Sequence, residues 1–216
     1  MIIRPEEWIS KPDHDGNGQL NAWMEDGEVN FPIPIETHNV FPEDVRMNEA
    51  QDFELILECA GKPEIYAEED AYSNAARHSM APESVIPAGV LSASGDADSE
   101  QSAYIILSGK VVEIYEDSAQ LGFDESDILY TLSCLGNEYD AVLHSEFSDD
   151  VQMKEGNIVS CVYRVQGWPK LDDNTSFPAS KKSIYRAVWK LHKCSGCESE
   201  ANRRFFQEGW LSTHSV

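Results

Sequence analysis

YIILSGKVVEIY, at residues 104–115, begins the one long region of the chain in which apolar pattern, glycines and turn residues agree. β-Branched and aromatic residues dominate the stretch, and Gly109 stands where a long strand could bend, which predicts a first strand. Three further strands are expected at residues 128–135, 138–144 and 156–169. The pair Gly136-Asn137 can reverse the chain between the second and third of these. The region predicts a small antiparallel β-barrel.

This order of a glycine-bent strand, a loop, a hairpin and a last strand ending in Gly167-Trp168 resembles the OB-fold, a compact Greek-key barrel. The resemblance covers about a third of the chain. Four strands are visible where the OB-fold has five, so an irregular β-sandwich or an SH3-like barrel remains open. The resemblance implies nucleic-acid or sugar binding, although a fold does not fix a function.

The rest of the chain predicts an α+β protein built around that barrel. Residues 1–100 are expected to form an irregular, strand-containing N-terminal region, residues 101–170 the OB-like barrel, and residues 171–216 a C-terminal helical pair packed on the body. Within the first region, residues 4–9 suggest a helical turn, 31–35 an extended segment, 52–60 and 64–66 strands, and 68–80 a short acidic helix. The polar run at 92–102 is the best candidate for a linker.

Charge is the strongest compositional signal. The net charge is −23, and residues 1–169 carry 34 acidic against 8 basic side chains, whereas residues 170–216 carry 5 against 8. Nucleic acid is an unfavourable partner for so anionic a body, because phosphate binding draws its affinity from Lys and Arg. The charge favours a basic protein partner, as for an immunity protein or an inhibitor that mimics nucleic acid. A solvated acidic surface without a specific partner is the simpler alternative.

Composition also bears on the compartment. No apolar window is long enough to cross a membrane, and the first residues lack the pattern of a signal peptide. Five cysteines at irregular spacing are typical of reduced, mostly buried thiols. We therefore expect a cytoplasmic protein without a membrane partner.

A loop near the N-terminus resembles the start of an EF-hand calcium loop. Asp13, Asp15 and Asn17 place side-chain oxygens at positions one, three and five, followed by the glycine that makes the sharp turn. Position twelve is Met24 instead of a bidentate glutamate, and Glu25 follows one residue late. Calcium bound by Asp13, Asp15, Asn17 and Glu25 is therefore one hypothesis, and an Asx-rich surface turn is the alternative.

A second candidate metal site lies near the C-terminus. Cys194 and Cys197 form a lone C-x-x-C with His192 two residues upstream, a spacing at which two thiolates can hold one zinc ion. A second C-x-x-C is absent from the sequence, so an ordinary turn between helices is the favoured interpretation of the pair. Apart from calcium or zinc at these two places, no cofactor is expected.

Motifs for catalysis are missing from the sequence. It contains no G-x-S-x-G, P-loop, H-E-x-x-H or G-x-G-x-x-G string, and no residue is assigned a catalytic role. The tyrosines on the expected strands could form a stacking platform for bases or could simply pack in the core; they are Tyr104, Tyr130, Tyr139 and Tyr163. A non-enzymatic binding protein is the leading expectation, and a metal- or ligand-binding OB-like module is the alternative.

Overall fold

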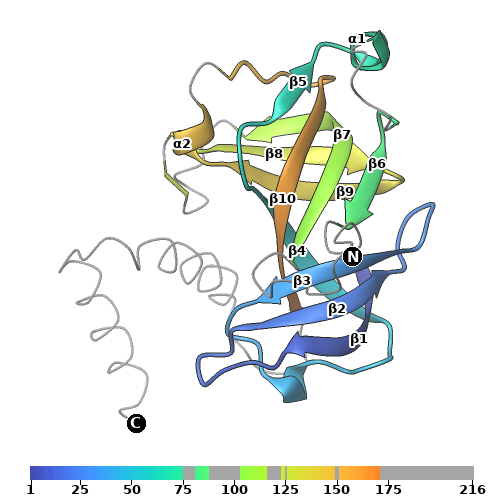
Figure 1. Cartoon of the computed structure of the whole chain (residues 1–216), viewed down its shortest axis with the longest axis vertical. Coiled ribbons are helices and arrows are strands. Elements are labelled where there is room, and N and C mark those ends of the chain that lie inside the picture. Colours follow the sequence, from blue (N-terminus) through green and yellow to red (C-terminus); the bar gives the residue numbers. More distant parts are fainter. Residues whose placement is uncertain (75–80, 88–102, 116–122, 125, 149–150, 171–216) are drawn as a thin grey trace, which may run out of the picture.

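The computed structural model describes residues 1–74, 81–87, 103–115, 123–124, 126–148 and 151–170 (Figure 1). The expected C-terminal helical pair at 171–216, with its candidate zinc ligands, lies outside these residues. The whole of the expected linker at 92–102 also lies outside them.

The described chain is built mainly from one ten-stranded sheet with the strand order β5-β10-β3-β2-β1-β4-β9-β8-β7-β6. The strands of the first part of the chain are β1 (Ile2–Ser10), β2 (Gly18–Met24), β3 (Phe31–Thr37), β4 (Gln51–Cys59), β5 (Glu64–Tyr66) and β6 (Ser84–Pro87). Those of the second part are β7 (Tyr104–Tyr115), β8 (Ile128–Cys134), β9 (Asn137–Leu143) and β10 (Ile158–Pro169). Helical structure is limited to η1 (Pro42–Asp44), α1 (Glu69–Asn74) and α2 (Ser145–Ser148) among the described residues.

β10 holds the sheet together, because it changes neighbours along its length. Its first half pairs antiparallel with β7 on one side and with β5 on the other. Its second half pairs antiparallel with β4, and Gln166 forms a single parallel bridge to Glu36 of β3. In Figure 1 this strand (orange) runs from beside β5 down past β3 and links the strands of the upper and lower parts.

The expected α+β fold with a separate OB-like barrel is wrong. The four strands expected between residues 104 and 169 are all present, but they belong to an irregular sheet that also contains the N-terminal strands. The reason is that the edges of the four strands are completed from outside the region. β6 pairs with β7, and β4 pairs with both β9 and β10. The division into regions at residues 100 and 170 stays a prediction.

The expected helical turn at residues 4–9 is also wrong, because these residues lie in β1, which pairs with β2. The expected extended segment at 31–35 lies in β3, whose prolines are compatible with a strand because its other side makes only the bridge at Glu36. The strands expected at 52–60 and 64–66 match β4 and β5.

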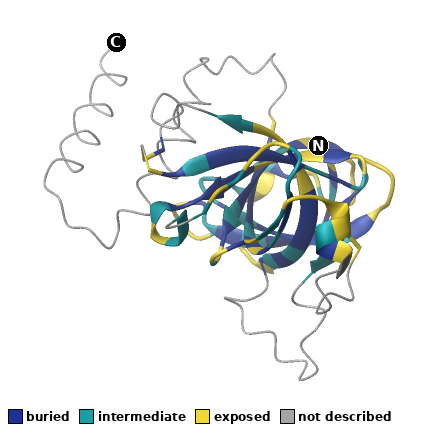
Figure 2. Ribbon diagram, turned by 90° about the horizontal axis from the view of Figure 1, so that it is seen from above, coloured by how far each residue is buried: buried dark blue, intermediate teal, exposed yellow. Residues whose placement is uncertain are grey.

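The core lies on the concave side of the sheet, which curves strongly around its buried residues (Figure 2). Its largest fully buried side chains include Tyr130, Tyr139 and Tyr163, and these three tyrosines therefore pack in the core and present no exposed stacking platform. At Gly109 the paired strands β7 and β8 approach closely, since a Cβ atom there would lie 2.7 Å from the carbonyl oxygen of Ser133 on β8. The glycine expected at the bend of the strand is thus required by the approach of its neighbour.

No helix among the described residues is long and apolar enough to cross a membrane.

Candidate functional site

An acidic hollow of about 590 Å³ lies on the outer face of β7, β8 and β9. We call it the acidic pocket. It is lined by Val112, Glu113, Tyr115, Thr131, Glu138, Asp140 and Glu155. Four of these seven residues carry carboxylates, and none is basic. The negative charge of this lining therefore favours a cationic group over an anionic one.

Strand register explains why these side chains share one face. Thr131 of β8 pairs with Glu113 of β7 on one side and with Asp140 of β9 on the other. Because side chains alternate between faces along a strand, Tyr115 and Glu138 project to the same side as this row. A register shift between Val111 and Glu113 marks a bulge at the rim of the pocket, and bulges commonly redirect side chains.

Hydrogen bonds order the floor of the acidic pocket. The Thr131 hydroxyl donates to Asp140 Oδ1 over 3.2 Å, and the Tyr115 and Thr131 hydroxyl oxygens lie 3.0 Å apart. The hydrogen bond with Thr131 lowers the pKa of Tyr115, but burial and the charges of Asp140 and Glu113 outweigh it and raise that pKa above its usual value. The phenol thus stays protonated and can donate to Asp140, which leaves the carboxylates as the acceptors that face solvent.

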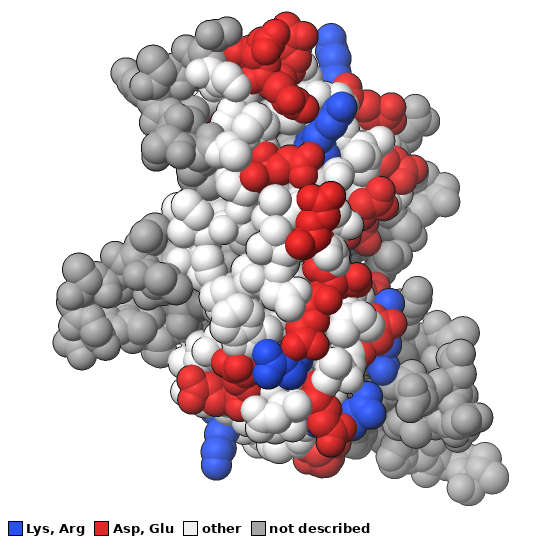
Figure 3. Space-filling view, turned by 90° about the vertical axis from the view of Figure 1, so that its right-hand side faces the viewer, with Lys and Arg blue, Asp and Glu red and all other residues white. Residues whose placement is uncertain are grey.

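The wider surface is acidic too. On the face shown in Figure 3, Asp and Glu side chains form a broken band from one end of the molecule to the other, with only a few Lys and Arg among them. Several of the described basic side chains are already engaged, because Arg4 pairs with Glu25, Arg164 with Glu36, and Lys170 with Asp52. A cation approaching this surface therefore meets mostly acceptors.

A buried cluster of ionisable and polar side chains lies inside the sheet, and sequence reasoning missed it. His144, which is 1% exposed, directly follows β9, and its Nε2 atom lies 2.7 Å from Glu58 Oε1 on β4. Its Nδ1 atom lies 3.4 Å from Asp127 Oδ2. Gln166 of β10 donates to the other oxygen of Glu58 over 2.9 Å. The four residues come from distant parts of the chain, so no local motif could reveal them.

The buried cluster continues toward the surface through Arg164. Its Nε atom lies 3.4 Å from Glu36 Oε2, and its guanidinium group sits 5.7 Å from the centre of the Tyr104 ring. The other oxygen of Glu36 lies 3.5 Å from His38 Nε2. Each ionisable side chain in this series has an ionisable group or a hydrogen-bond partner beside it. We interpret the series as structural because it joins β3, β4, β9 and β10.

The loop expected to bind calcium folds as a hydrogen-bonded turn. Asp13 Oδ1 accepts hydrogen bonds from the backbone amides of Asp15 and Asn17, each at 2.9 Å. The amide of Asn17 contributes most to lowering the pKa of Asp13. Asn17 Oδ1 in turn lies 3.0 Å from His38 Nδ1. Asx-turn chemistry accounts for this geometry.

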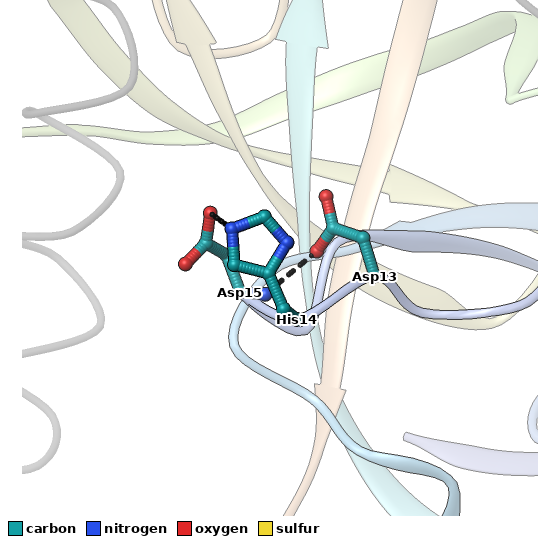
Figure 4. Close-up of side chains that lie close together, drawn as sticks. All are labelled: Asp13, His14 and Asp15. Carbon is teal, nitrogen blue, oxygen red and sulfur yellow. Dashed lines mark hydrogen bonds and ion pairs between the residues drawn. The ribbon is translucent and has the colours of Figure 1, made fainter.

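Possible metal ligands do cluster at the tip of this loop, where Asp13, His14 and Asp15 each place one ligand atom within 4.8 Å of the others (Figure 4). All three residues are exposed. Glu25 does not join them, because it follows β2 at the end opposite to the loop, about 20 Å away at the usual rise of a strand. Glu25 pairs instead with Arg4.

The candidate zinc ligands His192, Cys194 and Cys197 lie outside the described residues. Comparison of the chain with models of protein families, with curated proteins and with solved structures finds no match.

Proposed function

We propose that the protein is a non-enzymatic binding protein that captures a basic protein partner through the acidic pocket on β7, β8 and β9. The observation that carries the proposal is the lining of that hollow by Glu113, Glu138, Asp140 and Glu155 without a basic residue. A lysine or arginine side chain of the partner would enter the hollow and bind the carboxylates, with arginine favoured where two oxygens can be reached at once.

Long-range charge supports the same function. A net charge of −23 produces a field that attracts cationic surfaces and speeds their association. A protein that neutralises a nucleic-acid-binding toxin or enzyme needs this property, because its target carries a basic surface. An immunity protein or a nucleic-acid-mimicking inhibitor is therefore the form of binding protein that we favour.

A solvated acidic surface is the alternative, and the two differ in how locally the charge acts. If the acidic pocket is the binding site, removal of its charges weakens binding far more than removal of the same number of charges elsewhere. If charge acts only through its total, the position of the removed carboxylates is unimportant beyond screening.

The test compares two variants of equal net charge. The pocket variant carries Glu113→Gln, Glu138→Gln and Asp140→Asn, and the control variant carries Glu7→Gln, Glu43→Gln and Glu49→Gln at exposed positions outside the pocket. A synthetic oligoarginine peptide serves as the probe, and binding is measured by calorimetry at low and high salt. We expect the pocket variant to lose about tenfold in affinity and the control variant about twofold or less. Equal losses in the two variants, or binding that ignores salt, would refute the proposal.

Metal binding at the Asp13 loop is a second candidate function, supported by the cluster of Asp13, His14 and Asp15. The engagement of Asp13 Oδ1 with two backbone amides speaks against a tight calcium site, because a bound ion would compete for that oxygen. Calorimetry with calcium on protein freed of metal decides the question. Saturable binding that Asp15→Ala abolishes would establish this function.

A further inference from the structure

A second hollow, of about 380 Å³, lies between β5 with its flanking residues and the segment 151–157 that precedes β10. We call it the lysine pocket. Its polar lining consists of Lys62, Lys154, Gln152 and Asn157. None of the described residues that line it is acidic. In charge, the lysine pocket is therefore the opposite of the acidic pocket.

Two lysines in one hollow are unusual for this chain. Residues 1–169 carry 8 basic side chains against 34 acidic ones, and Lys62 and Lys154 are two of the 8. Both lysines are exposed, so their ammonium groups can reach a ligand from the rim of the hollow. The local charge of the lysine pocket thus opposes the net charge of the chain.

Strand alternation directs the acid of β5 away from the lysine pocket. Ile65 lines the hollow and pairs with Val159 of β10. Glu64 and Tyr66, on either side of Ile65, project to the other side of the strand. There the Tyr66 hydroxyl donates to Glu64 Oε2 over 2.7 Å. The short strand therefore contributes an apolar side chain to the hollow and no carboxylate.

A hydrogen-bonded turn separates the two hollows. Lys154 lines the lysine pocket, whereas the next residue, Glu155, lines the acidic pocket. The Lys154 amide donates to Asn157 Oδ1 over 2.9 Å, and the Asn157 amide donates to the Lys154 carbonyl oxygen over 3.1 Å. The Gly156 amide donates to the carbonyl oxygen of Val111 on β7 over 2.8 Å. These bonds fix the backbone of Lys154 at the wall of the hollow.

The rest of the lining is mainly apolar. Ile65 and Val151 are partly buried and pack against the hydrophobic core, and Pro63 is buried. Apolar walls with a few polar groups are typical of sites for small molecules, and the volume of about 380 Å³ lies within their usual range. An inorganic anion would contact the lysines alone. An anion with an apolar body would also cover Ile65 and Val151.

We propose that the lysine pocket binds a small organic anion, whose carboxylate or phosphate group contacts Lys62 and Lys154 and whose apolar body covers Ile65 and Val151. The paired lysines in a hollow with apolar walls carry this inference, which does not depend on the proposed binding function. A net charge of −23 repels anions at long range, so any affinity for an anion must come from local contacts.

The experiment titrates the isotope-labelled full chain with naphthoate and with naphthyl phosphate, while NMR follows the backbone amides. We expect at least one of the two to bind with a Kd on the order of 1 mM or lower, as ligands of this size commonly do. The shifted amides should include those of Ile65, Ala67 and Lys154. The tighter of the two ligands identifies the anionic group that the pocket prefers.

Two further probes separate the contributions of charge and apolar surface. Naphthamide has the same apolar body without the charge, and inorganic phosphate has the charge without the body. Both should bind at least about tenfold more weakly than the organic anions, because each lacks one of the two contacts. Naphthamide that binds as tightly as naphthoate, or inorganic phosphate that binds as tightly as naphthyl phosphate, overturns the proposal.

A pair of variants with equal net charge tests the lysines. The pocket variant carries Lys62→Gln and Lys154→Gln, and the control variant carries Lys11→Gln and Lys110→Gln at exposed positions that do not line the hollow. We expect the pocket variant to bind the organic anions about tenfold more weakly and the control about twofold or less. Equal losses would refute the proposal, as would a chain in which neither organic anion shows saturable binding.

A second variant blocks the hollow and keeps both lysines. Ala67 is exposed at its wall, so Ala67→Glu should leave the fold intact and place a carboxylate beside the lysines. We expect this variant to bind the organic anions about tenfold more weakly, because the new carboxylate competes with them. Ala81→Glu, at an exposed position that does not line the hollow, is the matched control. Unchanged affinity in a folded Ala67→Glu protein also overturns the proposal.

Discussion

His144 Nε2 lies 2.7 Å from Glu58 Oε1, and this contact joins the end of β9 to β4 inside the molecule. Asp127 approaches the other ring nitrogen, so the imidazole lies between two carboxylates. Nε2 is within hydrogen-bond distance of Glu58, whereas the contact of Nδ1 with Asp127 Oδ2 is longer, at 3.4 Å. We therefore expect this histidine to contribute to the stability of this part of the sheet.

Removing that histidine should be costly. We expect His144→Ala to lower the free energy of unfolding by about 3–5 kcal/mol, because it leaves two carboxylates in place without their shared partner. His14→Ala is the control, since His14 is exposed, and should change stability by less than about 0.5 kcal/mol. Urea unfolding followed by circular dichroism measures both. A small loss in His144→Ala would mean that Glu58 and Asp127 reach solvent.

Two glycines give a matched pair for testing the close approach of β7 and β8. Gly109→Ala should cost about 1–3 kcal/mol, because the new methyl group meets the Ser133 carbonyl oxygen at 2.7 Å. Gly61→Ala meets nothing within 4 Å and should change stability by about 0.5 kcal/mol or less. Thermal melts of the two variants test the packing of β7 on β8. Similar melting temperatures would contradict it.

Acid should weaken the tie between Asp52 and the end of β10. Burial raises the pKa of Asp52, but hydrogen bonds from the Met1 amine and Lys170 outweigh it and lower that pKa below its usual value. A lowered pKa stabilises the folded state above the unfolded-state pKa of about 3.9, and this contribution is lost as pH falls through the folded value. The difference in stability between the natural chain and Asp52→Asn should thus be present at pH 6 and vanish near pH 2.

The size of that difference is limited by exposure. The Asp52 side chain is 47% exposed, so screening by solvent should hold the effect to about 0.5 kcal/mol. Urea unfolding of both proteins across this pH range measures it, in low salt to limit screening further. A difference that grows toward low pH would contradict the assigned direction.

The turn at Asp13 makes a local prediction. Asp13→Ala removes the acceptor for the amides of Asp15 and Asn17, so these two amide protons should exchange with solvent faster. Amides in the centre of β2 should keep their exchange rates, because their partners on β1 and β3 are unchanged. Hydrogen exchange followed by NMR gives both sets of rates. Unchanged exchange at Asp15 and Asn17 would show that another group orders the loop.

The strands of the second half could be predicted because their local signals agree. β7 has the predicted bounds, Tyr104 to Tyr115. The turn predicted at Gly136 is present too, and this glycine adopts a φ of +79°, a conformation that favours glycine. The helical turn expected at residues 4–9 was wrong because the prediction used only local signals. Pro5 followed by two glutamates is typical of a helix start, but pairing with β2 outweighs that preference.

The joining of the two halves could not be predicted, since it depends on contacts between distant residues. Nothing near Trp168 in the sequence indicates that it pairs with Glu54, or that Gln166 reaches both β3 and β4. The acidic pocket could not be predicted either, because its residues are also far apart in the sequence. The excess of acid is visible in the composition, but the position of Glu155 beside Glu113 and Asp140 requires the folded sheet.

The double pairing of β10 also sets an order of events during synthesis. Until residues 158–169 have left the ribosome, β4 and β7 each lack the strand that completes them, and their edges stay open to other chains. Contacts that join residues so far apart in the sequence form slowly, because a long loop must close first. The nascent protein is therefore most exposed to aggregation just before its last described strand arrives, and a chaperone that shields strand edges would help it most at that moment.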